Sequence, residues 1–272
     1  MGKPVKRAPA VCLSLAVLLA AGAAASRFGG PTAVAKTETR SSSARAAVSA
    51  SSSAPVGGEN AQKSESDEPS SSSGKTLPVK NIQQLPELKA GCEVTSAAIV
   101  LNYLGYNIGK TGLAGYLNTD HNFITRNGGL YGPDPWISFV GSPMTDRYGC
   151  YAPVIVNMAN GYLRSVNSER KAVDLTGTAP SELYSYIDEG LPVIVWATVD
   201  MEKPSPGPEW NLNDTGESFQ WLLGEHCLVL IGYTDGTAVF SDPLDERGTV
   251  TYDRSLFEKR YAQLYSQAVL IR

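Results

Sequence analysis

Histidine and cysteine are both scarce in this chain. Its 272 residues include two histidines, His121 and His226, and four cysteines, none of which form a CxxC pair. Zinc sites of the usual kind are built from clusters of these residue types, so we expect no such site and no cofactor. Any chemistry that depends on histidine must use one of only two side chains.

The N-terminal apolar run is too short for an ordinary membrane helix. It extends from Val11 to Ala25, about 15 residues, whereas a spanning helix needs roughly 20. Lys3, Lys6 and Arg7 precede the run and small residues end it. We therefore predict that residues 1–26 are a secretory signal peptide cleaved near Ala25, with retention as an N-terminal anchor as the alternative. Either outcome makes the protein extracytoplasmic, secreted or at the cell surface.

Residues 27–76 contain few large apolar side chains and several serine runs, at 41–43, 51–53 and 70–73. Such a segment buries too little apolar surface to offset the entropy lost on ordering. We interpret it as a disordered Ser-rich linker that holds a domain away from a cell wall or membrane surface. A recognition tail is the alternative.

A basic cluster is also absent. The formal net charge is -4 at pH 7, and loss of the three positive signal residues would bring it to about -7, which argues against nucleic acid as a partner. Residues 77–272 are predicted to form one globular domain, which we expect to be a monomer. Its patterns predict helices at about 92–104, 110–118, 152–164 and 180–189, then strands at 192–199, 226–233, 238–241, 249–252 and 268–271.

Helical patterns before strand patterns indicate an α+β fold. Two segments, 119–150 and 200–224, are rich in turn residues and aromatics. We predict that both are loops, whose side chains Trp136, Tyr148, Trp210 and Trp221 wall a cleft.

Cys92 is the first candidate for chemistry. Removal of the signal leaves Cys92, Cys150 and Cys227, and an odd number of cysteines in an exported chain leaves at least one thiol unpaired. Cys92 begins the clearest predicted helix, where unpaired N–H groups favour a thiolate and can stabilise an oxyanion. The alternative is a buried structural cysteine. Cys227 is expected to pack in the core.

A thiolate nucleophile needs a histidine to exchange protons with it. His226 opens an apolar strand, whereas His121 lies in a polar segment and is expected to be an exposed loop residue. Asp242 can orient His226 if a three-residue hairpin loop, Thr234 to Gly236, sets it diagonal to the histidine on the same sheet face. A satisfied core histidine and a simple strand-ending turn are the alternative interpretations.

The segment from Ile82 to Ser96, IQQLPELKAGCEVTS, resembles the active-site segment of papain-like cysteine peptidases related to the bacteriocin-processing (double-glycine leader) peptidases. It is most similar to their exported, stand-alone branch in Gram-positive bacteria. The resemblance implies a papain-like fold, with N-terminal helices packed on a C-terminal antiparallel sheet. It also implies that Cys92 is the nucleophile, His226 the base, Asp242 the orienting acid and Gln84 the oxyanion donor, with Gln83 as the alternative donor.

These residues predict a thiol-dependent hydrolase of peptide or amide bonds that acts on a peptide or protein through an acyl-enzyme. An acyl or peptidyl transferase on the same fold, and a non-catalytic cell-surface binding module, are the alternatives.

Overall fold

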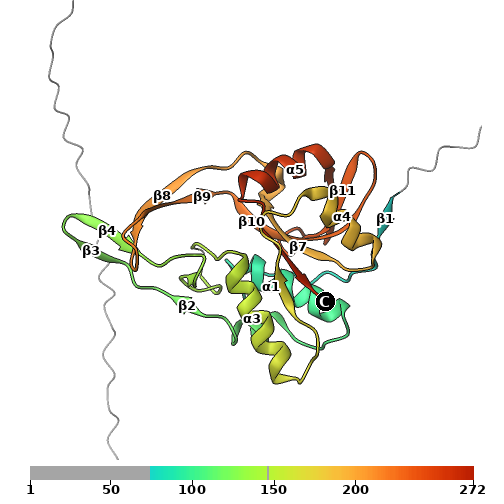
Figure 1. Cartoon of the computed structure of the whole chain (residues 1–272), viewed down its shortest axis with the longest axis horizontal. Helices are drawn as coiled ribbons and strands as arrows, with labels where there is room; N and C mark the ends of the chain where they lie inside the picture. Colours follow the sequence, from blue (N-terminus) through green and yellow to red (C-terminus); the bar gives the residue numbers. More distant parts are fainter. Residues whose placement is uncertain (1–73, 146) are drawn as a thin grey trace, which may run out of the picture. The chain divides into compact units, whose positions relative to one another are not determined.

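The computed structural model describes residues 74–145 and 147–272 (Figure 1). The predicted signal peptide and all but three residues of the predicted linker lie outside this range. Those three residues show that the domain begins slightly earlier than predicted, because Lys75–Thr76 form strand β1 and pair with a strand of the main sheet. No helix of the described part combines the length and the apolar character needed to cross a membrane.

One antiparallel sheet organises the domain. Its strands follow the order β12-β11-β10-β7-β13-β6, and β1 adds to β10. The bounds are Ala172–Asp174 for β6, Val193–Thr198 for β7, Glu225–Tyr233 for β10, Thr237–Ser241 for β11, Thr249–Asp253 for β12 and Ala268–Ile271 for β13. All five predicted strands are present, because β-branched and apolar runs of this length fit a sheet buried on both faces.

Helices cover both faces of this sheet. Helices α1 (Cys92–Tyr103), α2 (Lys110–Ala114) and α3 (Ala152–Ser165) pack with Trp196 and Val229 in one core cluster. Helices α4 (Pro180–Asp188) and α5 (Arg254–Gln263) pack with Val195 and Leu228 in the other. Consecutive residues of a strand therefore pack in opposite core clusters, because their side chains alternate between the two faces of the sheet. The four predicted helices are confirmed, although α2 is shorter than expected, and α5 was missed.

The two predicted loops contain strands. Residues 200–224 form a hairpin of β8 (Ser205–Leu212) and β9 (Ser218–Leu223) that reaches away from the main sheet (Figure 1). Residues 119–150 hold β2 (Thr119–Asp120), β3 (Ile124–Arg126), β4 (Gly129–Gly132) and β5 (Phe139–Val140). Strand β4 pairs with β8, and buried Trp210 donates from Nε1 to the Pro133 carbonyl at 2.9 Å. The sequence analysis did not predict this hairpin, because prolines normally break strands.

The β10–β11 connection sets the position of Asp242. Near the turn, Tyr233 pairs with Ala238, and the Thr234 N–H donates to the Thr237 carbonyl at 2.8 Å. This is the register of a two-residue turn, so the predicted three-residue pairing was wrong. A bulge between Leu230 and Gly232 then shifts the register by one residue, and Val229 pairs with Ser241. Beyond the bulge, β10 and β11 therefore have the pairing that was predicted, although the turn that joins them is not the predicted one.

Candidate active site

Cys92 is the first residue of α1 and is 8 % exposed. The preceding Gly91 packs against Leu88 so closely that a Cβ at Gly91 would lie 2.6 Å from the Leu88 Cβ. A side chain at Gly91 would therefore displace the start of the helix. This tight entry fixes the thiol at the helix N-terminus, where first-turn N–H groups have no partner within the helix.

The surroundings of the thiol are more acidic than the sequence suggested. Burial raises the pKa of Cys92, and the carboxyls of Glu93 and Glu225 raise it further, while a hydrogen bond with the Cys227 backbone lowers it. Together these effects place the pKa of the Cys92 thiol well above its usual range. The sequence predicted a lowered thiol pKa at the helix start; in the structure desolvation and the two carboxyls oppose the thiolate.

His226 and Asp242 form a buried pair. The His226 Nε2 lies 2.8 Å from the Asp242 Oδ1, and the two residues are 2 % and 4 % exposed. Burial raises the pKa of Asp242, but the hydrogen bond and charge of His226 outweigh it, with help from backbone N–H groups, and the pKa is lowered. Asp242 is thus held as a carboxylate, which fixes the imidazole and leaves Nδ1 for proton exchange.

The turn that carries Asp242 is clamped by the segment before α1. Asn81 donates from Nδ2 to the Asp242 carbonyl at 2.7 Å and to the Gly248 carbonyl at 3.1 Å. Gln83 donates from Nε2 to the Asp245 carbonyl at 2.7 Å. Sequence reasoning missed Asn81, because a lone asparagine in an extended segment is ordinarily a surface residue. The side-chain amide of Gln83 is therefore hydrogen-bonded within this clamp, to the Asp245 carbonyl and to the Asn81 Oδ1.

One cavity joins the predicted site residues. Cys92, His226 and Gln84 line a cavity of about 270 Å³, together with Tyr148, Trp221, Leu223 and Glu225. Gln84 donates one Nε2 hydrogen to the Lys89 carbonyl at 3.1 Å, which leaves the second Nε2 hydrogen for another acceptor. Asp242 adjoins the cavity through its bond to His226. Because Gln84 lines the cavity and Gln83 does not, Gln84 is the better candidate for the oxyanion donor.

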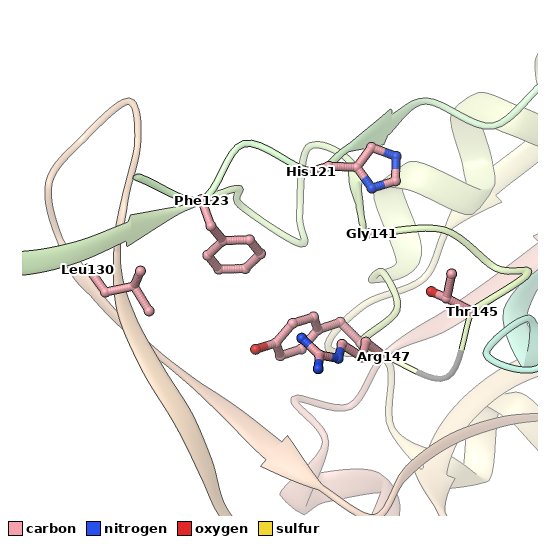
Figure 2. A pocket seen from close by; sticks show the side chains of 7 residues that line it. His121, Phe123, Leu130, Gly141, Thr145 and Arg147 are labelled. Atoms are coloured by element: carbon pink, nitrogen blue, oxygen red, sulfur yellow. The ribbon is translucent and has the colours of Figure 1, made fainter. Parts of the chain in front are cut away.

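His121 lies elsewhere. It is exposed and lines a separate cavity of about 520 Å³ with Phe123, Leu130 and Arg147, as Figure 2 shows. Tyr148 lines both cavities, so the two lie next to each other. Of the four aromatics predicted to wall the cleft, Tyr148 and Trp221 line the Cys92 cavity. Trp210 is buried against Phe123, and Trp136 packs on Tyr151.

Two glutamates form a close group with the thiol. The Cys92 Sγ, one carboxylate oxygen of Glu93 and one of Glu225 all lie within 4.8 Å of one another. The Cys92 Sγ is 3.4 Å from the Glu93 Oε2, and the Glu93 Oε1 accepts from the Cys150 N–H at 2.8 Å. A Cβ at Gly149 would lie 2.2 Å from the Glu93 Oε1, so a larger residue there would displace this carboxyl. Sequence reasoning missed both acids, although each is adjacent in sequence to a candidate catalytic residue.

The two carboxyls share a low-dielectric environment. Burial raises the pKa of Glu93 to about 7, against hydrogen bonds and the His226 charge that lower it. Burial and Glu93 raise the pKa of Glu225 well above its usual range. Two neighbouring carboxyls cannot both ionise cheaply, so at neutral pH the pair holds at least one proton.

Replacing Glu93 with glutamine should make the Cys92 thiol more reactive. We expect Glu93→Gln to alkylate with iodoacetamide about tenfold faster than wild type above about pH 8, because it removes a negative charge beside the sulfur. Below about pH 6 the ratio should approach one, since wild-type Glu93 is then protonated. Mass spectrometry of the labelled peptide gives the rate at Cys92.

Glu169→Gln, which alters an exposed carboxyl, is the matched control and should leave this rate unchanged. Equal rates for Glu93→Gln and wild type at every pH would contradict the electrostatic argument.

The other thiols are enclosed. Cys150 and Cys227 are both 0 % exposed, and all three described cysteines are free. Burial raises the pKa of each thiol, and Glu93 and Glu225 raise both further. Cys227 packs in the core with α1, as predicted. Cys92 is thus the described cysteine that faces the cavity.

Comparison with known proteins identifies the family of this chain. Residues 76–269 match the model of the Peptidase_C39 like family. The uncharacterized protein YvpB of Bacillus subtilis is 34% identical over 193 residues, which cover 71% of this chain and 73% of YvpB. A Bacillus anthracis crystal structure, provisionally assigned as a C39-like peptidase, shares 33% identity at a TM-score of 0.63, over 72% of this chain and 96% of that one.

A weaker likeness connects the chain to the peptidase domain of Streptococcus ComA, an ABC transporter, at 14% identity and a TM-score of 0.41, over 71% of this chain and 97% of that domain. The family match and the Bacillus relatives each span most of the folded part. The mixed helix and antiparallel-sheet architecture agrees with them. The chain therefore belongs to the Peptidase_C39-like family and has its papain-like cysteine peptidase fold.

Proposed function

We propose that this protein is an extracytoplasmic, thiol-dependent hydrolase of peptide or amide bonds. The observation that carries the proposal is the cavity lined by both Cys92 and His226, with His226 bonded through Nε2 to buried Asp242. A nucleophile, a base and a group that orients the base are the minimum set for acyl transfer through a covalent intermediate. Export rests on the signal-like character of residues 1–26.

The proposal gives each group a role. The Cys92 Sγ attacks the scissile carbonyl carbon, and its proton passes to the His226 Nδ1. The Cys92 backbone N–H and the second Nε2 hydrogen of Gln84 stabilise the oxyanion. The His226 imidazolium then protonates the leaving amine as the C–N bond breaks. Water hydrolyses the thioester, with His226 taking its proton, and the free thiol returns.

A thiol-directed peptide electrophile carrying a fluorophore tests the proposal. We expect wild-type protein without residues 1–26 to be labelled once, at Cys92, and Cys92→Ala to lose all labelling, because the other two thiols, at Cys150 and Cys227, are 0% exposed. Cys227→Ala is the matched control and should keep the label. Peptide mapping identifies the modified residue, and circular dichroism confirms that each variant is folded.

Two results would argue against the proposal. One is labelling that persists in folded Cys92→Ala. The other is labelling of wild type that is no faster than that of a free cysteine peptide and does not depend on His226.

A further inference from the structure

We propose that Glu225, supported by Glu93, forms a subsite for a positively charged substrate group, an ammonium or guanidinium on a residue that flanks the scissile bond. The inference rests on the proposed hydrolase and adds a substrate class to it. It starts from the two carboxyls beside the thiol, for which the hydrolytic mechanism has no use.

Glu225 faces the right space. It lines the same cavity as Cys92 and His226. Its Oε1 is buried and has no hydrogen-bond partner among the described residues. An unpaired buried carboxyl oxygen is costly, so its presence in the cavity of the thiol favours a ligand that supplies a donor.

A second acceptor in this cavity has the same property. Gln84 is 3 % exposed and lines the cavity, and its Oε1 also has no donor within the described part of the chain. The cavity therefore presents two buried acceptors that have no donor among the described residues. A ligand with several N–H groups would satisfy both, as an ammonium or guanidinium can.

The charges of the described residues point the same way. Neither Glu93 nor Glu225 forms a salt bridge with a described cation. Lys89 lines the cavity but is exposed, and the His226 ring is bonded to Asp242. The pair of carboxyls thus keeps a proton in place of a cation, and an incoming cation can displace that proton.

The reach of the carboxyls limits the substrate position. Ligand atoms of the two glutamates lie within 4.8 Å of the Cys92 thiol and of each other. During acyl transfer the scissile carbonyl carbon is bonded to that sulfur, so a side chain next to the scissile bond can reach the pair. Tyr148 and Trp221 line the same cavity, and aromatic rings favour contact with the stem or the charge of such a side chain.

A bound cation would also assist the chemistry. Glu93 and Glu225 raise the pKa of the Cys92 thiol, after burial itself. A positive group placed between them offsets that effect and favours the thiolate. The preference for charge should therefore appear in kcat as well as in KM.

Paired peptide libraries test the subsite. Both are randomised except for one fixed position, which holds lysine in one library and its neutral isostere norleucine in the other. We expect wild type to cleave next to lysine about tenfold or more in preference to norleucine. Glu225→Gln should reduce this preference to about one, whereas Glu246→Gln, which alters an exposed carboxyl, should keep it. Cleavage sites and rates are read by mass spectrometry.

A binding measurement separates the two proposals. Calorimetry measures the affinity of Cys92→Ala for lysine and norleucine peptides without turnover. In the double variant Cys92→Ala/Glu225→Gln, the preference for the lysine peptide should be lost. Equal cleavage and equal binding of both peptides would overturn the subsite and leave the hydrolase intact. Tighter lysine binding that depends on Glu225, without cleavage by wild type, would support the subsite and refute the hydrolase.

Discussion

His226→Ala is expected to lower kcat/KM for peptide hydrolysis by about 10³-fold or more. In the proposed mechanism the histidine takes the thiol proton and returns a proton to the leaving amine, and loss of one acid–base group typically costs 10²- to 10⁴-fold. The effect should be at the upper end here, because burial and two carboxyls already oppose ionisation of Cys92. Steady-state kinetics on a substrate selected from the peptide libraries provides the measurement.

His121→Ala is the matched control. His121 is the other histidine of the chain and lines the separate cavity of Figure 2, so its removal should leave the rate within about twofold of wild type. A comparable loss in both variants would mean that the second cavity takes part in the reaction. Full activity in His226→Ala would exclude the proposed base.

Trp196→Ala should lower the free energy of unfolding by about 3–5 kcal/mol. Trp196 lies on β7, is 0 % exposed, and donates from Nε1 to the Cys150 carbonyl at 3.0 Å. Its removal leaves a large cavity between the sheet and its helices and an unpaired carbonyl. Urea denaturation followed by circular dichroism measures the change.

Ile137→Ala, at a residue that is 57% exposed, should change the same quantity by less than about 0.5 kcal/mol. Trp196→Phe keeps much of the volume and should fall between the two variants. A loss of less than about 1 kcal/mol in Trp196→Ala would show that the core collapses around the missing ring, contrary to close packing.

The main sheet was predictable because its strands are unambiguous. The run from Val193 to Thr198 is apolar at nearly every position, and so is the run that follows His226. Strand alternation also separated Cys227 from the face of Leu228 correctly. The β8–β9 hairpin was not predictable, because its stability comes from Trp210 and Trp221 packing on distant residues, which proline-rich local sequence does not reveal.

The candidate site was predictable where sequence pattern and chemistry agree. Cys92 at a helix start and His226 at a strand start were identified, and the structure brings both to one cavity. The bulge at Ile231 was not foreseen, so Asp242 was placed by the wrong turn geometry. The acidic pair was missed because Glu93 and Glu225 meet only when α1 docks on β10, and their effect on the thiol depends on burial that no local pattern shows.

The clamp at Asn81 makes the Asp242 turn depend on the segment before α1. A chain that began after Thr76 would lose strand β1, which pairs with β10. Trimming past Asn81 would free the Asp242 turn and yield a fragment with an intact thiol but a poorly oriented imidazole. The position of the N-terminus relative to Asn81 therefore decides whether the Asp242 turn keeps these two hydrogen bonds.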